Sequence, residues 1–192
     1  MTFSGKFYAA VLAKIFAVIA VIMVVSWAQG KDTDELYLGG LDWNDKALVF
    51  NWHPVLMIVG LLGCFGWGIT SFRNDFLSKP INKGLHVFFY VTAVVCFGLG
   101  LKAVWLSHDD TPDGSYKANL YSIHSWLGLA AVMLFGQNFL LGLLHFANPT
   151  LAVEIKQNYM PNHVFLGILT FVTAVMAMET GELSGIIVCL FD

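Results

Sequence analysis

The sequence is poor in charged residues. Only 12% of its 192 residues are Asp, Glu, Lys or Arg, whereas 57% are hydrophobic. A soluble domain carries about 25% charged residues, so this chain has too few to cover a globular surface, and we expect lipid to cover much of it. The sequence also contains no basic stretch, which argues against nucleic acid as a partner. The composition therefore predicts an integral membrane protein in a lipid bilayer.

Cysteine is scarce as well. The chain has three cysteines, Cys64, Cys96 and Cys189, and the first two lie midway along apolar runs, where cysteine behaves as a small buried hydrophobe. No zinc-binding spacing is present. The absence of a C-x-x-C-H motif argues against covalently attached haem, and the odd number of cysteines argues against a disulfide framework.

Long apolar runs are abundant. Five of them are long enough to cross a bilayer, which takes about 20 residues, and we place them at 7–28, 47–72, 84–106, 120–146 and 162–178. Because a bilayer offers no water to backbone polar groups, such spans must be helical. The predicted fold class is an all-α integral membrane protein, a multi-helix transmembrane bundle of five spans within a single domain over residues 1–192.

Both ends of the chain need an interpretation. The first apolar run is too long for the core of a signal peptide, and no clear cleavage site follows it, so we expect it to remain as a span. The apolar segment 186–191 is too short to cross a membrane. Five spans then place the two termini on opposite sides.

The connectors predict the orientation. The connector from Arg73 to Lys83 also holds Lys79, and Lys6 and Lys14 lie near the N-terminus, whereas the connectors on the other side are richer in acids. Positive residues favour the cytoplasmic side of a membrane. We therefore expect the N-terminus and the first of these connectors to be cytosolic.

Four of the six histidines lie a few residues after the start of a span: His53, His86, His124 and His163. Successive spans run in opposite directions, so His53 and His124 fall near the outer face and His86 and His163 near the inner face. Spans two and four run parallel, as do spans three and five, so each pair can face across a bundle. The two levels are separated by roughly 15–20 Å.

This arrangement is compatible with one b-type haem per pair. Ionisable residues inside spans are costly and tend to be functional, and imidazole is a common ligand of haem iron. Gly128 and Gly167, each four residues after a histidine on the same helix face, could leave a gap for a flat macrocycle. On spacing alone, packing remains the alternative, with histidines held by hydrogen bonds and glycines, including Gly60, Gly63 and Gly66, at helix contacts.

Cations gather around the inner histidines. Lys79 and Lys83 precede His86, Lys156 precedes His163, and Arg73 closes the second span. Such a group favours an anion, although the ordinary excess of cations on the cytoplasmic side also explains it, and these residues could instead neutralise haem propionates. The remaining His145 is expected to be structural. His108, just past the outer end of the third span, is interpreted first as a solvated loop residue.

At these residues the sequence resembles the cytochrome b561 family of transmembrane ascorbate-linked reductases, especially the animal ascorbate and ferric reductases. The matching stretches are 50–54, 83–86, 119–128 and 161–163. The resemblance implies that spans two to five form a four-helix core that ligates two haems b, His53 with His124 on the outer side and His86 with His163 on the inner side. It also implies cytosolic ascorbate as the electron donor and monodehydroascorbate or ferric iron as the acceptor.

The resemblance assigns substrate residues too. Arg73, Lys79, Lys83 and Lys156 match the family's cytosolic ascorbate side, and His108, Asn119, Tyr121 and Ser122 match its outer substrate region. The family's sixth helix and most of the loop before it are expected to be missing here, which leaves stability and the possible homodimer open. The implied location is an endomembrane vesicle, a lysosomal membrane or the plasma membrane.

Two other functions remain open at this point. One is a haem-bearing membrane anchor that passes electrons to a protein partner. The presence of two substrate openings, with cations around the inner histidines only, argues against it. The other is a histidine-based metal transporter or channel for zinc. That function would require carboxylate or histidine neighbours along one helix, whereas these histidines are single residues among apolar ones.

Overall fold

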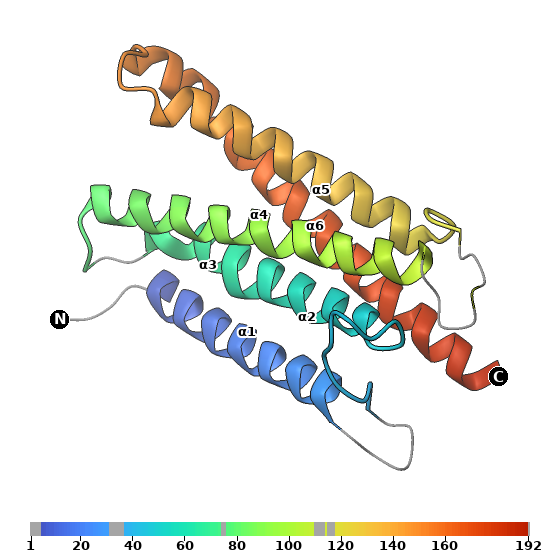
Figure 1. Cartoon of the computed structure of the whole chain (residues 1–192). Coiled ribbons are helices and arrows are strands. Elements are labelled where there is room, and N and C mark those ends of the chain that lie inside the picture. Colours follow the sequence, from blue (N-terminus) through green and yellow to red (C-terminus); the bar gives the residue numbers. More distant parts are fainter. Residues whose placement is uncertain (1–4, 31–36, 74–75, 110–113, 115–117, 192) are drawn as a thin grey trace. The chain divides into compact units, whose positions relative to one another are not determined.

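The computed structural model describes residues 5–30, 37–73, 76–109, 114 and 118–191, with the backbone alone for 182–191. Within these ranges every regular element is a helix (Figure 1). The chain divides into two compact units, Met1–Ala118 and Asn119–Asp192, here called unit 1 and unit 2. Each unit has its own helix packing and is described by itself.

Unit 1 contains three long helical segments, of which the second is built from several short turns. Its elements are α1 (Gly5–Gln29), η1 (Val49–Asn51), α2 (Trp52–Ile58), η2 (Val59–Phe65), α3 (Gly66–Thr70), η3 (Ser71–Arg73) and α4 (Lys79–Asp109). Both α1 and α4 pack along this second segment (Figure 1). The element η2 is a π-helix, in which one extra residue is accommodated within a helix.

Two glycines let α4 approach the second segment closely. A Cβ at Gly60 would lie 2.6 Å from the ring of Phe97, and a Cβ at Gly68 would overlap the ring of Tyr90. Gly63 makes no such contact, because a Cβ there would meet only Val59 of the same helix, at 3.9 Å. The small residues that bring these helices together are therefore Gly60 and Gly68, of which the sequence indicated only the first.

Unit 2 is a hairpin of two long helices. It consists of α5 (Ile123–Gly142), the π-helix η4 (Leu143–Ala147) and α6 (Val153–Phe191). Ser122 caps α5, because its Oγ accepts a hydrogen bond of 3.2 Å from the backbone N–H of Ser125, as serine at an N-cap position commonly does.

The fifth span begins earlier than predicted. The apolar run placed the start of this span at Asn162, but α6 begins at Val153 and carries Pro161 in its interior. Proline removes one backbone hydrogen bond, and the exposed ring of Pro161 is accommodated while the helix continues on both sides. At the other end, α6 runs on to Phe191, so the segment 186–191 continues the helix.

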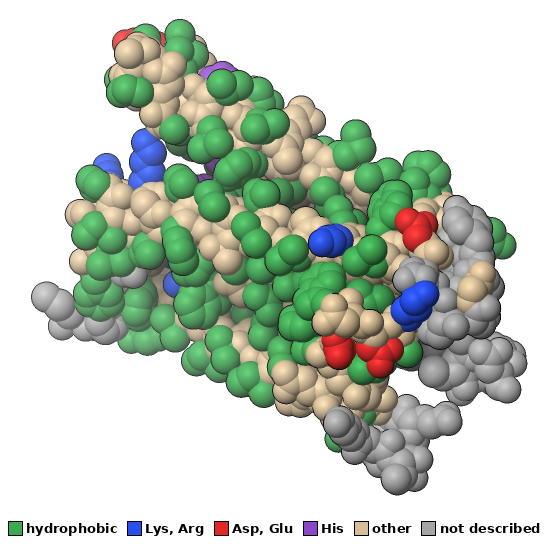
Figure 2. Space-filling view, viewed as in Figure 1, with side chains coloured by type: hydrophobic (Ala, Val, Ile, Leu, Met, Phe, Trp, Pro, Cys, Tyr) green, Lys and Arg blue, Asp and Glu red, His purple; other side chains and the backbone are tan. Residues whose placement is uncertain are grey.

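Five described helical segments are long and apolar enough to cross a membrane: Gly5–Gln29, Val49–Arg73, Lys79–Asp109, Ile123–Ala147 and Val153–Gly181. This confirms the five predicted spans. The visible face is covered mostly by hydrophobic side chains, and most charges lie toward the helix ends (Figure 2). Large apolar side chains such as Phe16 and Met23 are 61% and 66% exposed, which a bilayer tolerates and water does not. The chain is a multi-pass integral membrane protein.

Candidate functional site

Two of the candidate ligands, His53 and His86, lie in unit 1, and each is held by the helical segment that carries the other. His53, in α2, places its Nδ1 3.0 Å from the carbonyl oxygen of Gly100 in α4. His86, in α4, places its Nδ1 2.9 Å from the carbonyl oxygen of Gly68 in α3. A carbonyl oxygen can only accept, so Nδ1 must carry the proton in both rings. In a neutral imidazole Nε2 then keeps its lone pair.

The histidines of unit 2 are arranged in the same reciprocal way. His124, in α5, donates from Nδ1 to the carbonyl oxygen of Ala177 in α6, at 2.7 Å. His163, in α6, packs against Gly142 in α5, where an added Cβ would lie 3.1 Å from its Cε1. The side-chain amide of Asn138, also in α5, donates to the backbone oxygen of His163 at 3.2 Å.

This chemistry fits histidines that bind a metal. Metal-ligating histidines usually donate their second ring N–H to a backbone carbonyl, a carboxylate or a water molecule, which fixes the tautomer and the ring orientation. His53, His86 and His124 have this bond, and in the tautomer that it fixes Nε2 carries the lone pair that binds a metal. Aromatic rings lie beside the imidazoles. The distance between ring centres is 5.8 Å for Phe50 and His53, 4.4 Å for Tyr90 and His86, and 5.1 Å for Phe146 and His163. The residues present therefore fit haem as a ligand.

His145 shows what a structural histidine in the same chain looks like. Its Nδ1 bonds to the carbonyl oxygen of Leu141, one turn earlier on its own helix, at 2.8 Å. Its ring stacks on Tyr159 at 3.9 Å. The hydrogen bond stays within its own helix, and the ring reaches α6 only through stacking on Tyr159, so the structural role of His145 stays a prediction.

The glycines that contact the imidazoles differ from those singled out in the sequence. A Cβ at Gly128 would meet nothing within 4 Å, and one at Gly167 would meet the amide of Asn138 at 3.5 Å. Instead, a Cβ at Gly181 would lie 2.7 Å from Nδ1 of His124, and Gly142 contacts His163. Gly128 and Gly167 were expected to leave a gap for a macrocycle and not to contact the rings; the open space at Gly128 is compatible with such a gap, which stays a prediction.

A regular spacing could have identified the carbonyl partners. Gly100 follows His86 by 14 residues and Ala177 follows His163 by 14. Gly68 follows His53 by 15, and the π-helix η2 between them accommodates the extra residue.

The predicted anion-binding cations lie at helix ends. In unit 1, Arg73 ends η3, Lys79 begins α4 and Lys83 follows one turn later, so all three gather at the end that holds His86; all three are exposed. In unit 2, Lys156 lies in the first turn of α6, seven residues before His163, and is partly exposed.

The predicted outer residues belong to both units. His108 lies at the end of α4 in unit 1, and the other three precede α5 in unit 2. Tyr121 is 90% exposed and is accessible to a substrate. Ser122 caps α5, which alone explains a serine at that position. Leu120 adopts a left-handed backbone with φ of 57°, which shapes the turn before the cap.

Asn51 has a role that the sequence did not reveal. Its buried side-chain amide donates to the carbonyl oxygens of Leu38 and Gly40, both at 2.8 Å. Beside it, Trp52 stacks on Trp43 with ring centres 5.4 Å apart. These contacts fix the segment before the second span onto the end that carries His53.

Membrane-spanning helices with three histidines oriented as metal ligands usually are define a multi-pass membrane protein whose residues fit a histidine-bound cofactor. The family model described as eukaryotic cytochrome b561 matches residues 52–187, and the chain belongs to this family. Cytochromes b561 are haem-binding proteins.

Curated relatives agree with this assignment. The chain is 34% identical over 166 residues to transmembrane ascorbate ferrireductase 1 of Arabidopsis thaliana, covering 85% of this chain and 65% of that protein. It is 30% identical to a lysosomal membrane ascorbate-dependent ferrireductase of Homo sapiens, covering 93% and 71%. It is 32% identical to ascorbate-specific transmembrane electron transporter 2 of Zea mays, covering 89% and 70%. The chain thus spans about two thirds of the length of these relatives.

Proposed function

We propose that this protein is an ascorbate-dependent transmembrane oxidoreductase. It takes single electrons from cytosolic ascorbate and delivers them to monodehydroascorbate or ferric iron on the other side. The names of its relatives support the donor and, for the ferrireductases, the acceptor. The observation that carries the proposal is the donation from Nδ1 of His53, His86 and His124 to backbone carbonyl oxygens.

Two haems b are the proposed cofactors, held by His53 with His124 and by His86 with His163. When bound, they supply one-electron carriers at two depths of the membrane. The protein's own contribution is orientation and tuning: the carbonyl oxygens of Gly100, Gly68 and Ala177 hold the imidazoles and raise the basicity of Nε2. Burial and hydrogen bonding around the ligands then set the redox potential.

The cations at the His86 and His163 ends are proposed to bind ascorbate. Ascorbate is an anion at neutral pH, and the exposed side chains of Arg73, Lys79 and Lys83 at one end of unit 1 can attract it from the cytosol, together with Lys156. Lysine and arginine bind anionic oxygens through charge-assisted hydrogen bonds. His108, Asn119, Tyr121 and Ser122 are proposed to form the outer substrate region.

The wider context of the protein is proposed on the same basis. Spans two to five form one four-helix core, the N-terminus faces the cytosol, and the membrane is an endomembrane vesicle, a lysosomal membrane or the plasma membrane. The human relative is named as a lysosomal membrane protein, which supports one of these locations. A homodimer is also compatible with this function.

The test is an optical spectrum of the purified full chain, expressed with haem supplied in excess. We expect about two b-type haems per chain, reduced on addition of ascorbate. The matched control is His145→Ala, which removes a histidine bonded only within its own helix and should keep both haems. A folded, colourless protein, or one that takes up zinc stoichiometrically and no haem, would disprove the proposal.

A further inference from the structure

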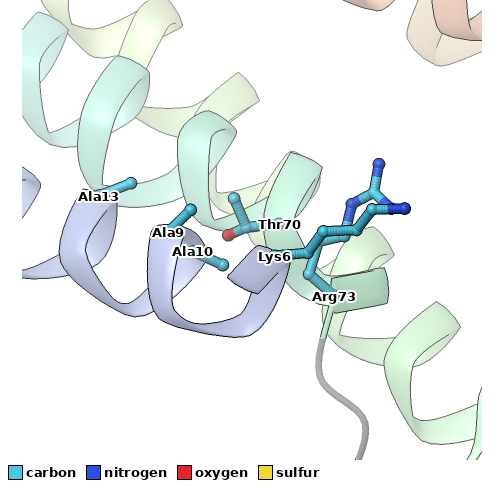
Figure 3. Close-up of a pocket in the computed structure, with 6 residues that line it drawn as sticks. All are labelled: Lys6, Ala9, Ala10, Ala13, Thr70 and Arg73. Carbon is cyan, nitrogen blue, oxygen red and sulfur yellow. The ribbon is translucent and has the colours of Figure 1, made fainter. Parts of the chain in front are cut away.

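A crevice separates α1 from the end of the second helical segment in unit 1. Its volume is about 350 Å³, and it is lined by Lys6, Ala9, Ala10, Ala13, Thr70 and Arg73 (Figure 3). The three alanines and Lys6 come from α1, whereas Thr70 and Arg73 end α3 and η3. Methyl side chains facing a neighbouring helix leave the space that a larger residue would fill.

The charge in this crevice has one sign. Its lining includes two cations and no acid, and the side chains of Lys6 and Arg73 lie beside each other at one end (Figure 3). The first turn of α1, which begins at Gly5, contains no acidic residue. Lys14, further along α1, lies over the ring of Trp67 at 5.6 Å and is not part of the lining. The crevice therefore favours an anion.

The remainder of the crevice favours hydrocarbon. Below the two cations its wall is made of three alanines and Thr70, whose hydroxyl already donates within its own helix, to the carbonyl oxygens of Gly66 and Trp67 at 3.1 Å each. The adjoining surface of α1 exposes Tyr8, Leu12 and Phe16 by more than half, and α1 is a membrane span. A ligand here meets positive charge at the membrane edge and apolar surface toward the bilayer interior.

We propose that this crevice binds an anionic phospholipid, with the phosphate between Lys6 and Arg73 and an acyl chain along Ala9, Ala10 and Ala13. A small soluble anion would match the cations but would leave the apolar wall uncovered. A bound lipid would tie α1 to the second span at the end that carries Arg73. Arg73 is shared with the proposed ascorbate site, but the inference rests on the lining of the crevice and not on the identity of the electron donor or acceptor.

The test is lipid binding by the full-length haem-loaded protein after delipidation in detergent. Phosphatidylglycerol and phosphatidylcholine with identical acyl chains are added, and bound lipid is counted by native mass spectrometry. Since each basic residue near a membrane surface favours an anionic lipid, we expect phosphatidylglycerol to bind roughly 10-fold more tightly to the wild type. The double variant Lys6→Gln/Arg73→Gln should lose this preference, and Lys6→Arg/Arg73→Lys should keep it.

Two further variants separate charge from shape. Ala13→Leu keeps both cations but fills the crevice, so it should weaken binding of both lipids. Lys79→Gln removes a cation that lies at the same end of unit 1 as Arg73 but does not line the crevice, and it should leave lipid binding unchanged. The haem spectrum of each variant reports whether it has folded; if the double variant has not, Ala13→Leu against Lys79→Gln decides.

Two results would overturn the proposal. One is equal binding of phosphatidylglycerol to the wild type and to a folded double variant, or to the wild type and to folded Ala13→Leu. The other is displacement of the lipid by millimolar inorganic phosphate or ascorbate, which would show that the crevice takes a soluble anion. Neither result changes the number of haems expected in the wild type or their reduction by ascorbate, so the proposed function is tested separately by the spectrum of the wild-type protein.

Discussion

Units 1 and 2 both hold their candidate ligands between a pair of antiparallel helical segments, but the contacts that hold the imidazole rings differ between the units. In each unit, antiparallel helical segments carry a histidine near their start, and that histidine contacts the partner segment near its end. Unit 1 uses two glycine carbonyls, of Gly100 and Gly68. Unit 2 uses the carbonyl of Ala177 for His124 and a glycine contact, at Gly142, for His163.

The difference shows which parts of the arrangement can vary. Because the imidazole is held by a backbone carbonyl, the side chain of the residue that supplies it can be absent or a methyl group. What cannot vary is space beside the ring. In unit 2 that space depends on Gly181, whereas at Gly100 in unit 1 a Cβ would meet the flexible end of Met57, at 3.0 Å.

The largest expected effect comes from removing ligands in pairs. If each haem is shared by one histidine from each unit, His86→Ala should lose one haem, and His86→Ala/His163→Ala should lose no more, because both bind the same iron. In contrast, His53→Ala/His86→Ala, confined to unit 1, should lose both. The measurement is haem per chain by the pyridine haemochrome assay, with reduction by ascorbate for the single variants.

The single variants add a direction to this prediction. His86→Ala and His163→Ala should abolish the haem that ascorbate reduces first, whereas His53→Ala and His124→Ala should spare it. If the double variant within unit 1 kept one haem, each haem would belong to one unit, and the pairing across units would be wrong.

A smaller effect is expected from a methyl group beside one ring. Gly181→Ala places a Cβ 2.7 Å from Nδ1 of His124 and should push the ring away from the carbonyl of Ala177. Loss of such a supporting bond typically weakens metal binding about 10–100-fold, so we expect haem affinity at the His124 site to fall about 10-fold. The measurement is retention of haem during titration with apomyoglobin.

Two controls test whether the position decides the effect. Gly136→Ala makes the same change in α5 where nothing lies within 4 Å, and it should be neutral or stabilise the helix by up to ~1 kcal/mol. In Gly100→Ala the new Cβ would lie 3.0 Å from the movable end of Met57 and 3.4 Å from Cβ of Leu56, but not against an imidazole, so this variant should cost less haem than Gly181→Ala. Equal losses in all three variants would mean that helix packing, rather than the imidazole contact, is what Gly181 protects.

The number of spans could be predicted from the sequence because bilayer thickness sets the length of an apolar run. The helix boundaries were less certain. The apolar run begins at Asn162, but α6 begins at Val153, because the more polar residues before the run continue the helix and the one backbone hydrogen bond that Pro161 removes does not end it. A π-helix such as η2 leaves the apolar pattern of the second span almost unchanged, so it could not be predicted.

The candidate ligands could be predicted because ionisable residues are rare inside spans. Their carbonyl partners were not predicted, because a backbone carbonyl has no side-chain signature and only the spacing of 14 or 15 residues from a histidine on the same segment marks it. Gly128 and Gly167 were singled out by spacing along one helix, whereas Gly142 and Gly181 contact the rings from the partner helix. Asn51 was visible as part of a motif, but its two acceptors, Leu38 and Gly40, lie in a segment without regular structure.

The smallest expected effect compares the cations of the two units. Of the four proposed ascorbate-binding cations, unit 1 supplies three and unit 2 supplies only Lys156. Lys83→Ala therefore leaves two of these cations in unit 1, whereas Lys156→Ala leaves none in unit 2. Exposed charge pairs contribute about 1 kcal/mol or less, so each change should raise the ascorbate concentration for half-maximal reduction rate by about 2–5-fold, with Lys156→Ala the larger. The measurement is stopped-flow haem reduction at low salt, where screening is weak.

Lys102→Ala, toward the other end of α4, should leave this concentration unchanged. Haem content should stay constant throughout, and an unchanged half-saturation in both variants would remove these cations from the donor site.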